Sequence, residues 1–182
     1  MKRIQLKGKE FEIFLTEDII LKEVARVAKQ LNDDYKDKDP LFVCVLNGAF
    51  MFAAELVGRF DSDCELTFIR IQSYEGIKRG ESIREIQSMI ENVQNRHVII
   101  VEDIIDTGHT MHYLINKLKE QNPATVRIAT LLFKPDALQL PVQPDYVAKT
   151  IPNDFIVGFG LDFNGHGRNL RNIYKVVTES LC

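Results

Sequence analysis

The feature that most constrains the fold is an apolar run that ends in acidic residues and a small polar turn. Residues 98–101 are four β-branched side chains in succession, a pattern typical of a strand buried on both faces in a parallel sheet. The run continues through Glu102 and Asp103 into an Asp-Thr-Gly-His-Thr turn at residues 106–110. Beyond the turn, the apolar residues of 111–118 follow helical spacing. We therefore expect a strand, a tight turn and a helix, with the turn at the N-terminus of the helix.

That turn has the chemistry of a phosphate site. Free backbone N–H groups and the helix dipole favour an anion at a helix N-terminus. Thr107 and Thr110 add hydroxyl groups, and Gly108 allows the backbone to approach closely. No Gly-Lys-Ser/Thr sequence follows, so the turn is not the loop that cradles a nucleoside triphosphate. The neighbouring Glu102 and Asp103 suit vicinal hydroxyls or a hydroxyl-bound divalent metal, and a ribose 5-phosphate satisfies both demands.

The rest of the chain alternates strand and helix patterns, which predicts an α/β fold with a mostly parallel sheet flanked by helices. A hairpin is predicted over residues 4–6 and 11–15, and Thr16 is a candidate N-cap for a helix whose apolar stripe is Ile20, Val24, Val27 and Leu31. Further helices are predicted at about 49–60 and from the polar turn to about residue 121. Further strands are predicted at 41–46, 65–73, 125–133, 146–150, 155–160 and 173–177.

Composition narrows the class of protein. The 182 residues carry a net charge of −3 and a pI near 5.8, which disfavours a nucleic-acid-binding surface. No apolar stretch approaches the length of a membrane span. Cys44, Cys64 and Cys182 lack metal-binding spacing, and Cys44 lies inside an apolar strand pattern. We therefore expect a single domain over residues 1–182, with a buried thiol, in the reducing cytoplasm.

The segment from Val101 to Thr110 resembles the signature of type I phosphoribosyltransferases, which bind 5-phosphoribosyl-1-pyrophosphate (PRPP). Its form, Val-Glu-Asp-Ile-Ile-Asp-Thr-Gly-x-Thr, resembles the hypoxanthine–guanine branch. The resemblance implies the type I phosphoribosyltransferase fold, in which terminal segments form a small hood. It also implies that PRPP and hypoxanthine or guanine react, with Mg²⁺ as cofactor, to give IMP or GMP and pyrophosphate. A homodimer or homotetramer is implied as the assembly.

The resemblance gives four residues a role at the purine. Asp106 would be the general base that takes the N7 proton while N9 of the purine attacks the sugar. Lys134 would donate to the 6-oxygen, which selects 6-oxopurines over adenine. Phe155 would stack on the purine ring, and the backbone of Ile156 would meet its edge.

The other implied roles concern PRPP and the metal. The residues implied to bind PRPP are Asn47, Gly48, Ser73, Tyr74, Glu102, Asp103, Asp106, Thr107, Gly108, His109, Thr110 and Arg168. The implied magnesium ligands are Glu102, Asp103 and Asp162. The Leu46-Asn47-Gly48 loop would present backbone groups to pyrophosphate, often through a cis peptide, and Ser73 and Tyr74 would begin a lid that excludes water.

Three segments depart from the family pattern. Asn47 stands where Lys or Arg is common, so a backbone role there is expected and a side-chain ion pair is not. The lid has Ile77-Lys78-Arg79 where small Ser or Thr residues are usual. Gly165-His166-Gly167 replaces bulkier residues before Arg168.

Other interpretations use the same residues. Asp106-Thr107-Gly108 is also the triplet of aspartic proteases, but those enzymes need two copies and the chain has one. His109 and His112 could suggest zinc, although no further ligands accompany them. Within the family, transfer to xanthine or a pyrimidine and a non-catalytic, nucleotide-binding regulator remain alternatives. The set of Asp106, Lys134, Asp162 and Arg168 favours catalysis over the regulator.

Overall fold

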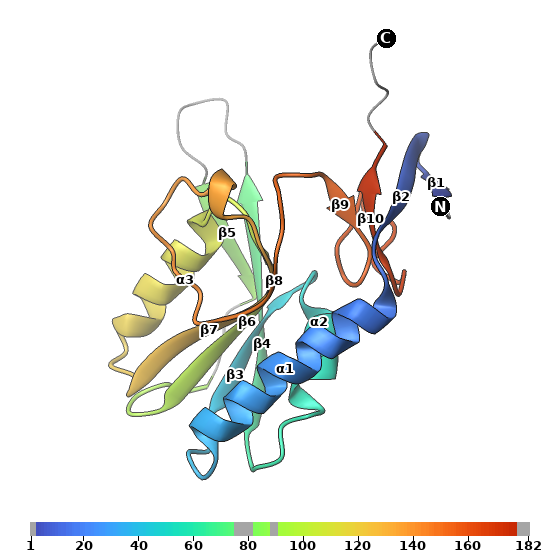
Figure 1. Cartoon of the computed structure of the whole chain (residues 1–182). Helices are drawn as coiled ribbons and strands as arrows, with labels where there is room; N and C mark the ends of the chain where they lie inside the picture. The colour runs from blue at the N-terminus through green and yellow to red at the C-terminus, as the bar shows by residue number, and fades with distance from the viewer. Residues whose placement is uncertain (1–2, 75–81, 88–90, 178–182) are drawn as a thin grey trace.

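The computed structural model describes residues 3–74, 82–87 and 91–177, with side chains in all of these except 72–74 and 82–87. In that part of the chain, a large sheet carries helices on both faces and a small sheet lies beside it (Figure 1). The elements in chain order are β1 (Arg3–Leu6), β2 (Lys9–Leu15), α1 (Glu17–Tyr35), β3 (Leu41–Leu46), α2 (Phe50–Val57), β4 (Glu65–Tyr74), β5 (Ser82–Gln87), β6 (His97–Ile105), α3 (His109–Lys119), β7 (Thr125–Phe133), the 3-10 helix η1 (Pro135–Ala137), β8 (Tyr146–Thr150), β9 (Ile156–Val157) and β10 (Ile173–Val176).

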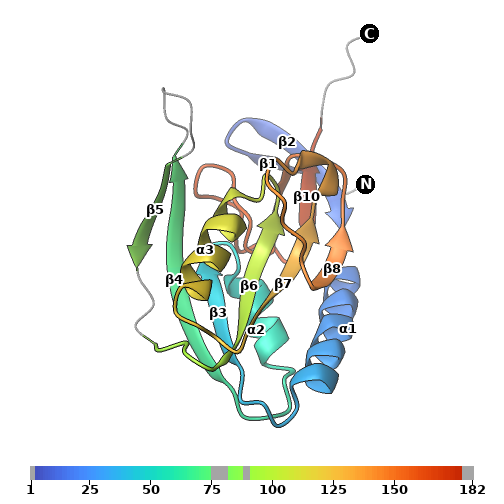
Figure 2. The same cartoon turned by 90° about the vertical axis from the view of Figure 1, so that its left-hand side faces the viewer.

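The large sheet has the strand order β5-β4-β3-β6-β7-β8 (Figure 2). Neighbouring strands are parallel except β5, which pairs antiparallel with β4. Helices α1 and α2 pack on one face and α3 packs on the other. The predicted α/β fold with a mostly parallel sheet is confirmed.

The order of the strands places a ligand site. From β3 the chain passes through α2 to β4, whereas from β6 it passes through α3 to β7, in the opposite direction across the sheet. Because β3 and β6 are neighbours, their carboxyl ends form the switch point at which open α/β sheets bind ligands. The loop after β3 and the turn after β6 both begin there.

The core explains why these segments form strands and helices. Residues 98–101 of β6 are fully buried between α3 on one face and α1 and α2 on the other, as the β-branched run predicts. The apolar stripe of α1 is buried as predicted. On α3, Met111, Leu114 and Leu118 pack against the opposite face of the sheet. Burial of such side chains stabilises the fold by about 1.5–3 kcal/mol each.

Two expectations from composition can be compared with the structure. Cys44 is fully buried in β3, as predicted, and burial, followed by the nearby charge of Glu102, raises the pKa of its thiol to about 12. This thiol is therefore unreactive at neutral pH. Among the described residues, no helix is both long and apolar enough to span a membrane.

The small sheet has the order β1-β2-β10-β9 and, together with the loop of residues 158–172, is called the hood below. The predicted hairpin is confirmed as β1 and β2. Phe11 of β2 is fully buried against Val157 and Tyr174, so the N-terminal and C-terminal segments share one small core. In Figures 1 and 2 the hood stands beside one end of the large sheet.

Two predicted elements are shorter than expected. The strand predicted at 155–160 is reduced to Ile156–Val157, because Gly158, Phe159 and Gly160 all have positive φ and turn the chain out of the sheet. The helix predicted at 49–60 ends at Val57. Conversely, β6 continues to Ile105, so Glu102 and Asp103 lie within a strand and not after it.

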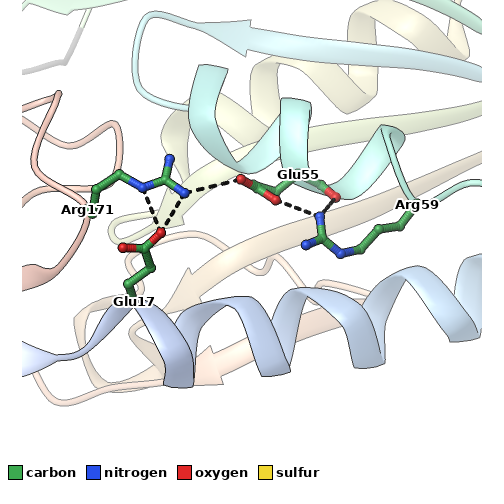
Figure 3. Close-up of polar contacts among 4 residues, drawn as sticks. All are labelled: Glu17, Glu55, Arg59 and Arg171. Carbon is green, nitrogen blue, oxygen red and sulfur yellow. Dashed lines mark hydrogen bonds and ion pairs between the residues drawn. The ribbon is translucent and has the colours of Figure 1, made fainter.

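Side-chain contacts attach the hood to the large sheet's helices. The Arg171 guanidinium forms ion pairs with Glu17 of α1 at 2.7 Å and Glu55 of α2 at 3.4 Å, and Glu55 also pairs with Arg59 at 2.6 Å (Figure 3). Thr16 is the N-cap residue of α1, as predicted, but its side chain makes no cap hydrogen bond. The Glu17 amide instead donates to Asn172 Oδ1 of the hood at 2.8 Å, a partner 155 residues away.

Candidate active site

The predicted phosphate turn lies at the carboxyl end of β6 and passes directly into α3. Gly108 precedes the helix with φ of 88°, a left-handed conformation that glycine adopts at no steric cost. The backbone and side chains of residues 138–142 also pack closely against it, so a Cβ there would crowd them. The strand end and the turn, residues 102 and 104–111, line a cavity of about 80 Å³. A space of this size at a helix N-terminus suits one phosphate group.

The adjacent acids at the end of β6 are buried. Glu102 and Asp103 are each 8 % exposed. Burial, followed by the charge and hydrogen-bonding influence of Asp103, raises the pKa of Glu102 well above its usual range. Burial also raises the pKa of Asp103, although hydrogen bonds and the charge of Arg168 act against it. Glu102 Oε2 is buried without a hydrogen-bond partner in the described part of the chain.

The loop after β3 meets this acid pair. Its Leu46-Asn47 peptide is cis, as the family resemblance implies for this position. A Cβ on Gly48 would overlap the Asp103 carboxylate, and a Cβ on Gly160 would overlap the Gly48 carbonyl oxygen. The two glycines thus allow three segments to converge: the end of β6, the loop after β3 and the hood.

Asp106 and Lys134 lie side by side because β6 and β7 are parallel and end in register, with Ile105 opposite Phe133. Lys134 Nζ is 3.1 Å from Asp106 Oδ2, and the Lys134 amide donates to the Ile105 carbonyl at 2.9 Å. The lysine is 6 % exposed, whereas the Asp106 side chain is 44 % exposed. A buried lysine with one accessible carboxylate partner is an unusual arrangement for a strand end, where lysines are ordinarily solvated.

Two of the residues predicted to contact a purine, Phe155 and Ile156, come from the hood side. Phe155 is 47 % exposed, yet its ring packs on Phe163 at 5.6 Å and on Phe11 at 6.3 Å between centroids. The Phe155 carbonyl accepts from the Val176 amide, and Ile156 pairs with Lys175 of β10. A half-exposed aromatic ring held by other rings offers a flat apolar face to a ligand.

Asp162 and Arg168 form a local pair within the hood. Arg168 Nη2 is 2.6 Å from Asp162 Oδ1, and its Nη1 donates to the Gly160 carbonyl at 2.7 Å. Asp162 Oδ2 accepts from the Gly165 amide at 2.6 Å. Over residues 3–71 and 91–177, no three or more acidic, His or Cys side chains gather to hold a metal ion. Glu102, Asp103 and Asp162 are therefore not gathered into one such cluster, and their role as magnesium ligands stays a prediction.

Two residues near the site were not predicted from the sequence, Asn153 and Arg70. Asn153 Oδ1 lies 3.5 Å from Lys134 Nζ, and Arg70 lines a cavity with Asn47 and Arg168. A single Arg in the alternating pattern of β4 is an ordinary exposed residue; only the parallel register, which sets Arg70 beside Leu46, brings it to the site.

Part of the predicted site falls outside what the structure describes. The backbone of Ser73 and Tyr74 forms the end of β4, but their side chains are not described. The lid residues Ile77, Lys78 and Arg79 also lie outside the described residues.

Comparison with known proteins agrees with this geometry. Residues 12–164 match the phosphoribosyl transferase domain family. Hypoxanthine-guanine phosphoribosyltransferase of Streptococcus thermophilus is 42 % identical over 160 residues, which cover 87 % of this chain and 88 % of that protein. The Streptococcus pneumoniae enzyme of the same name is 39 % identical, with 87 % and 89 % covered.

Solved structures lead to the same family. Hypoxanthine phosphoribosyltransferase of Trypanosoma cruzi, in complex with its product IMP, is 34 % identical, with a TM-score of 0.86 over 97 % of this chain and 98 % of that one. The Staphylococcus aureus enzyme is 32 % identical, with a TM-score of 0.87 over 91 % of both chains. The chain therefore belongs to the phosphoribosyl transferase family and, within it, to the hypoxanthine–guanine phosphoribosyltransferases.

Proposed function

We propose that this protein transfers ribose 5-phosphate from PRPP to hypoxanthine or guanine, releasing pyrophosphate and IMP or GMP. One observation carries the proposal: the small phosphate-sized cavity, the buried acid pair and the Asp106–Lys134 pair occupy one edge of the sheet. A sugar phosphate bound by its anion in that cavity would present its ring to the acids and its anomeric carbon toward Asp106. The names of the relatives support a purine acceptor, so a pyrimidine acceptor or a non-catalytic regulator is not favoured.

The Asp106–Lys134 pair accounts for both selection and proton transfer. In the described geometry, Lys134 donates to Asp106. A 6-oxopurine offers the ammonium a carbonyl acceptor, so the lysine can turn to the base and leave Asp106 to accept the N7 proton. Adenine presents an amino donor at that position, and the buried lysine would then lack a purine partner. Phe155 would hold the ring by stacking.

The acid pair suits the sugar and a magnesium ion. Magnesium in such sites is bound by one or two carboxylates together with substrate oxygens, so a complete protein cage is not needed. The unpartnered Glu102 Oε2 and the raised pKa of both acids fit this role, because a cation or a pair of hydroxyls would satisfy them. Glu102, Asp103 and, from the hood, Asp162 would hold the ion, which supplies charge neutralisation of the leaving group when bound. The acids would also favour positive charge that develops on the ribose ring.

The remaining PRPP contacts are divided between the loops. The backbone of Asn47 and Gly48 and the Arg168 guanidinium would bind the pyrophosphate, while Thr107, Gly108, His109 and Thr110 would bind the 5-phosphate. Ser73 and Tyr74 would close over the reacting sugar and keep water from the activated donor.

An exposed apolar patch supports assembly into a homodimer or homotetramer. Leu66 and Phe68 lie on the α2 side of β4, in register with Phe42 and Cys44, and both are exposed, as is Phe50 of α2. Patches of this kind commonly mark protein–protein contacts. Light scattering on the purified protein, with Phe68→Lys as the disrupting variant, tests the assembly. We further propose that the enzyme works in the cytoplasm, where a free thiol such as Cys44 stays reduced.

The activity is tested with a panel of bases. Purified protein is incubated with PRPP, Mg²⁺ and hypoxanthine, guanine, xanthine, adenine or uracil, and nucleotide formation is followed. The expected result is rapid formation of IMP or GMP, abolished by chelation of magnesium and restored by its return. Turnover of uracil or adenine without hypoxanthine would overturn the substrate, and full activity under chelation would remove magnesium from the proposal.

A further inference from the structure

A second cavity lies at the carboxyl end of β3, beside the interior of β4 and the loop that carries the cis peptide. It has a volume of about 230 Å³ and is lined by Leu46, Asn47, Arg70, Ile71 and Arg168. The parallel register of β3 and β4 places Leu46 directly beside Arg70. The alternation along β4 sends Ile69 and Ile71 into the core on the α3 side, so Arg70 points to the other face, next to the loop.

The charges in this cavity come from two arginines. The loop residues Asn47, Gly48 and Ala49 carry no charge. Arg168 is already engaged, because it pairs with Asp162 and donates to the Gly160 carbonyl. Arg70 is exposed and makes no hydrogen bond or ion pair with any residue that the structure describes. The cavity is thus lined by two guanidinium groups beside a neutral loop: that of Arg168, which is paired within the hood, and that of Arg70, which has no such partner in the described residues.

This arrangement has the chemistry of a site for a multiply charged anion. A guanidinium presents a planar fork of N–H donors that matches phosphate oxygens in a bidentate geometry. An exposed arginine ordinarily projects into water, but the register holds this one at the wall of a cavity whose other cation is Arg168. The Asp103 carboxylate, proposed above to lie at the sugar, packs against Gly48, the residue that follows Asn47 in the loop. An anion here would lie next to the sugar site without entering the 5-phosphate cavity.

We propose that Arg70 is a further substrate-binding residue, which contacts the pyrophosphate group of PRPP and of the released product. The inference rests on the proposed function, since it presupposes PRPP as the donor. Arg70 supplies from β4 the positive charge that the neutral Asn47-Gly48-Ala49 loop lacks. It acts on the leaving group, so it affects PRPP and pyrophosphate and leaves the purine contacts unchanged.

The test compares Arg70→Gln and Arg70→Lys with the wild type in both directions of the reaction. Arg70→Gln is expected to raise the KM for PRPP and, in the reverse reaction from IMP, the KM for pyrophosphate by about 10-fold or more, the usual effect of losing a charge-assisted hydrogen bond. Arg70→Lys should give an intermediate value because the charge stays and the bidentate fork is lost. The KM for hypoxanthine and for IMP should stay within about twofold.

A matched control is Arg127→Gln, which removes an exposed arginine at the amino end of β7, away from this edge of the sheet. It should leave all four KM values unchanged. Calorimetric titration with magnesium pyrophosphate gives a readout that does not need turnover, and Arg70→Gln should weaken that binding by the same factor. Unchanged KM values for PRPP and pyrophosphate in folded Arg70→Gln, with melting temperature as the check, would overturn the inference. Failure of the wild type to form nucleotide would overturn the proposed function instead.

Discussion

The two halves of the candidate site are built in different ways. The half on the large sheet places Glu102, Asp103, Asp106 and Lys134 at the ends of buried parallel strands, where backbone hydrogen bonds fix each position. The half on the hood places Phe155, Asp162 and Arg168 on or beside a two-residue strand and a loop with several positive-φ residues. Partly exposed ion pairs and a few hydrogen bonds join that loop to α1 and α2 (Figure 3).

This difference predicts that the two halves contribute differently to catalysis and to substrate binding. Strand register fixes atoms that must meet with little tolerance, such as those of Asp106, the proposed proton acceptor, and Lys134. Contacts among exposed charges are individually weak, so they suit parts that bind and release substrates. We therefore expect variants in the sheet half to change the rate of the chemical step, and variants in the hood half to change substrate affinity.

The largest effect is expected at Asp106. Asp106→Asn removes the proposed proton acceptor while keeping the size of the side chain and its position beside Lys134, so kcat should fall by about 10²–10⁴ with smaller changes in KM. Steady-state kinetics with hypoxanthine and PRPP measure this. Asp136→Asn, an exposed acid in η1, is the matched control. Unchanged turnover in Asp106→Asn would remove the residue from the chemistry.

A smaller effect is expected at Phe155 in the hood. Phe155→Ala deletes the exposed ring that rests on Phe163 and Phe11, so the KM for hypoxanthine should rise by about 5–10-fold with kcat retained, consistent with loss of one stacking contact. The KM for PRPP in the same variant serves as an internal reference. An equal loss in kcat would show that the division between the halves is wrong.

A gain in stability is expected at Glu102. The pKa of Glu102 is higher in the folded protein than in the unfolded chain. Its contribution to stability is therefore fully present below about pH 4.5 and is lost as the pH rises through the raised pKa of the folded state. Glu102→Gln, which cannot ionise, should raise the melting temperature without substrates or metal by about 2–4 °C near neutral pH, for roughly 1 kcal/mol.

The gain in melting temperature of Glu102→Gln should disappear at acidic pH, where the wild-type Glu102 and the Gln of the variant are both neutral. Scanning calorimetry at acidic and neutral pH measures the difference. A variant that is less stable than the wild type at neutral pH would contradict the assignment of a costly buried carboxylate. Activity should fall in the same variant, because we propose that the acid pair binds the sugar and the metal.

The smallest effect is expected at Arg171. Arg171→Gln breaks the pairs with Glu17 and Glu55, and exposed pairs are worth about 0–1 kcal/mol, so the melting temperature should fall by no more than about 4 °C. Arg3→Gln, which breaks an exposed pair inside the hood, is the control. A raised KM for PRPP in Arg171→Gln and not in Arg3→Gln would indicate that attachment of the hood matters for binding.

The fold of the large sheet could be predicted well because its strands are continuous buried runs. Residues 41–46, 125–133 and 146–150 form strands with the predicted bounds, each a run that both faces of a parallel sheet can bury. The hood was harder to predict. Phe155 to Gly160 has the composition of a strand, but positive φ angles at residues 158–160 end it, and nothing in the local pattern distinguishes a strand glycine from a turning one.

The site shows the same contrast. Asp106, Thr107 and Gly108 are consecutive, so their shared geometry can be inferred from the sequence alone. Contacts that depend on register or on distant segments could not be inferred, such as Arg70 beside Leu46. The hydrogen bond at the start of α1 is a second case. Thr16 has the residue type of a local cap, but the side chain that accepts from the Glu17 amide is Asn172, near the other end of the chain. Local preference identifies the position, and tertiary packing decides which side chain fills it.

The pairing of β2 with β10 has a consequence for synthesis. This contact joins residues 11–15 to residues 173–176, and β9 adds to the same sheet only through β10. During synthesis, β9 has no neighbour in the small sheet until β10 has emerged from the ribosome, so the Phe155 ring, which we propose stacks on the purine, cannot be seated before then. A nascent chain stalled before residue 173 would therefore carry Asp106 and the turn that we propose binds phosphate, yet lack the support for the proposed nucleobase contact.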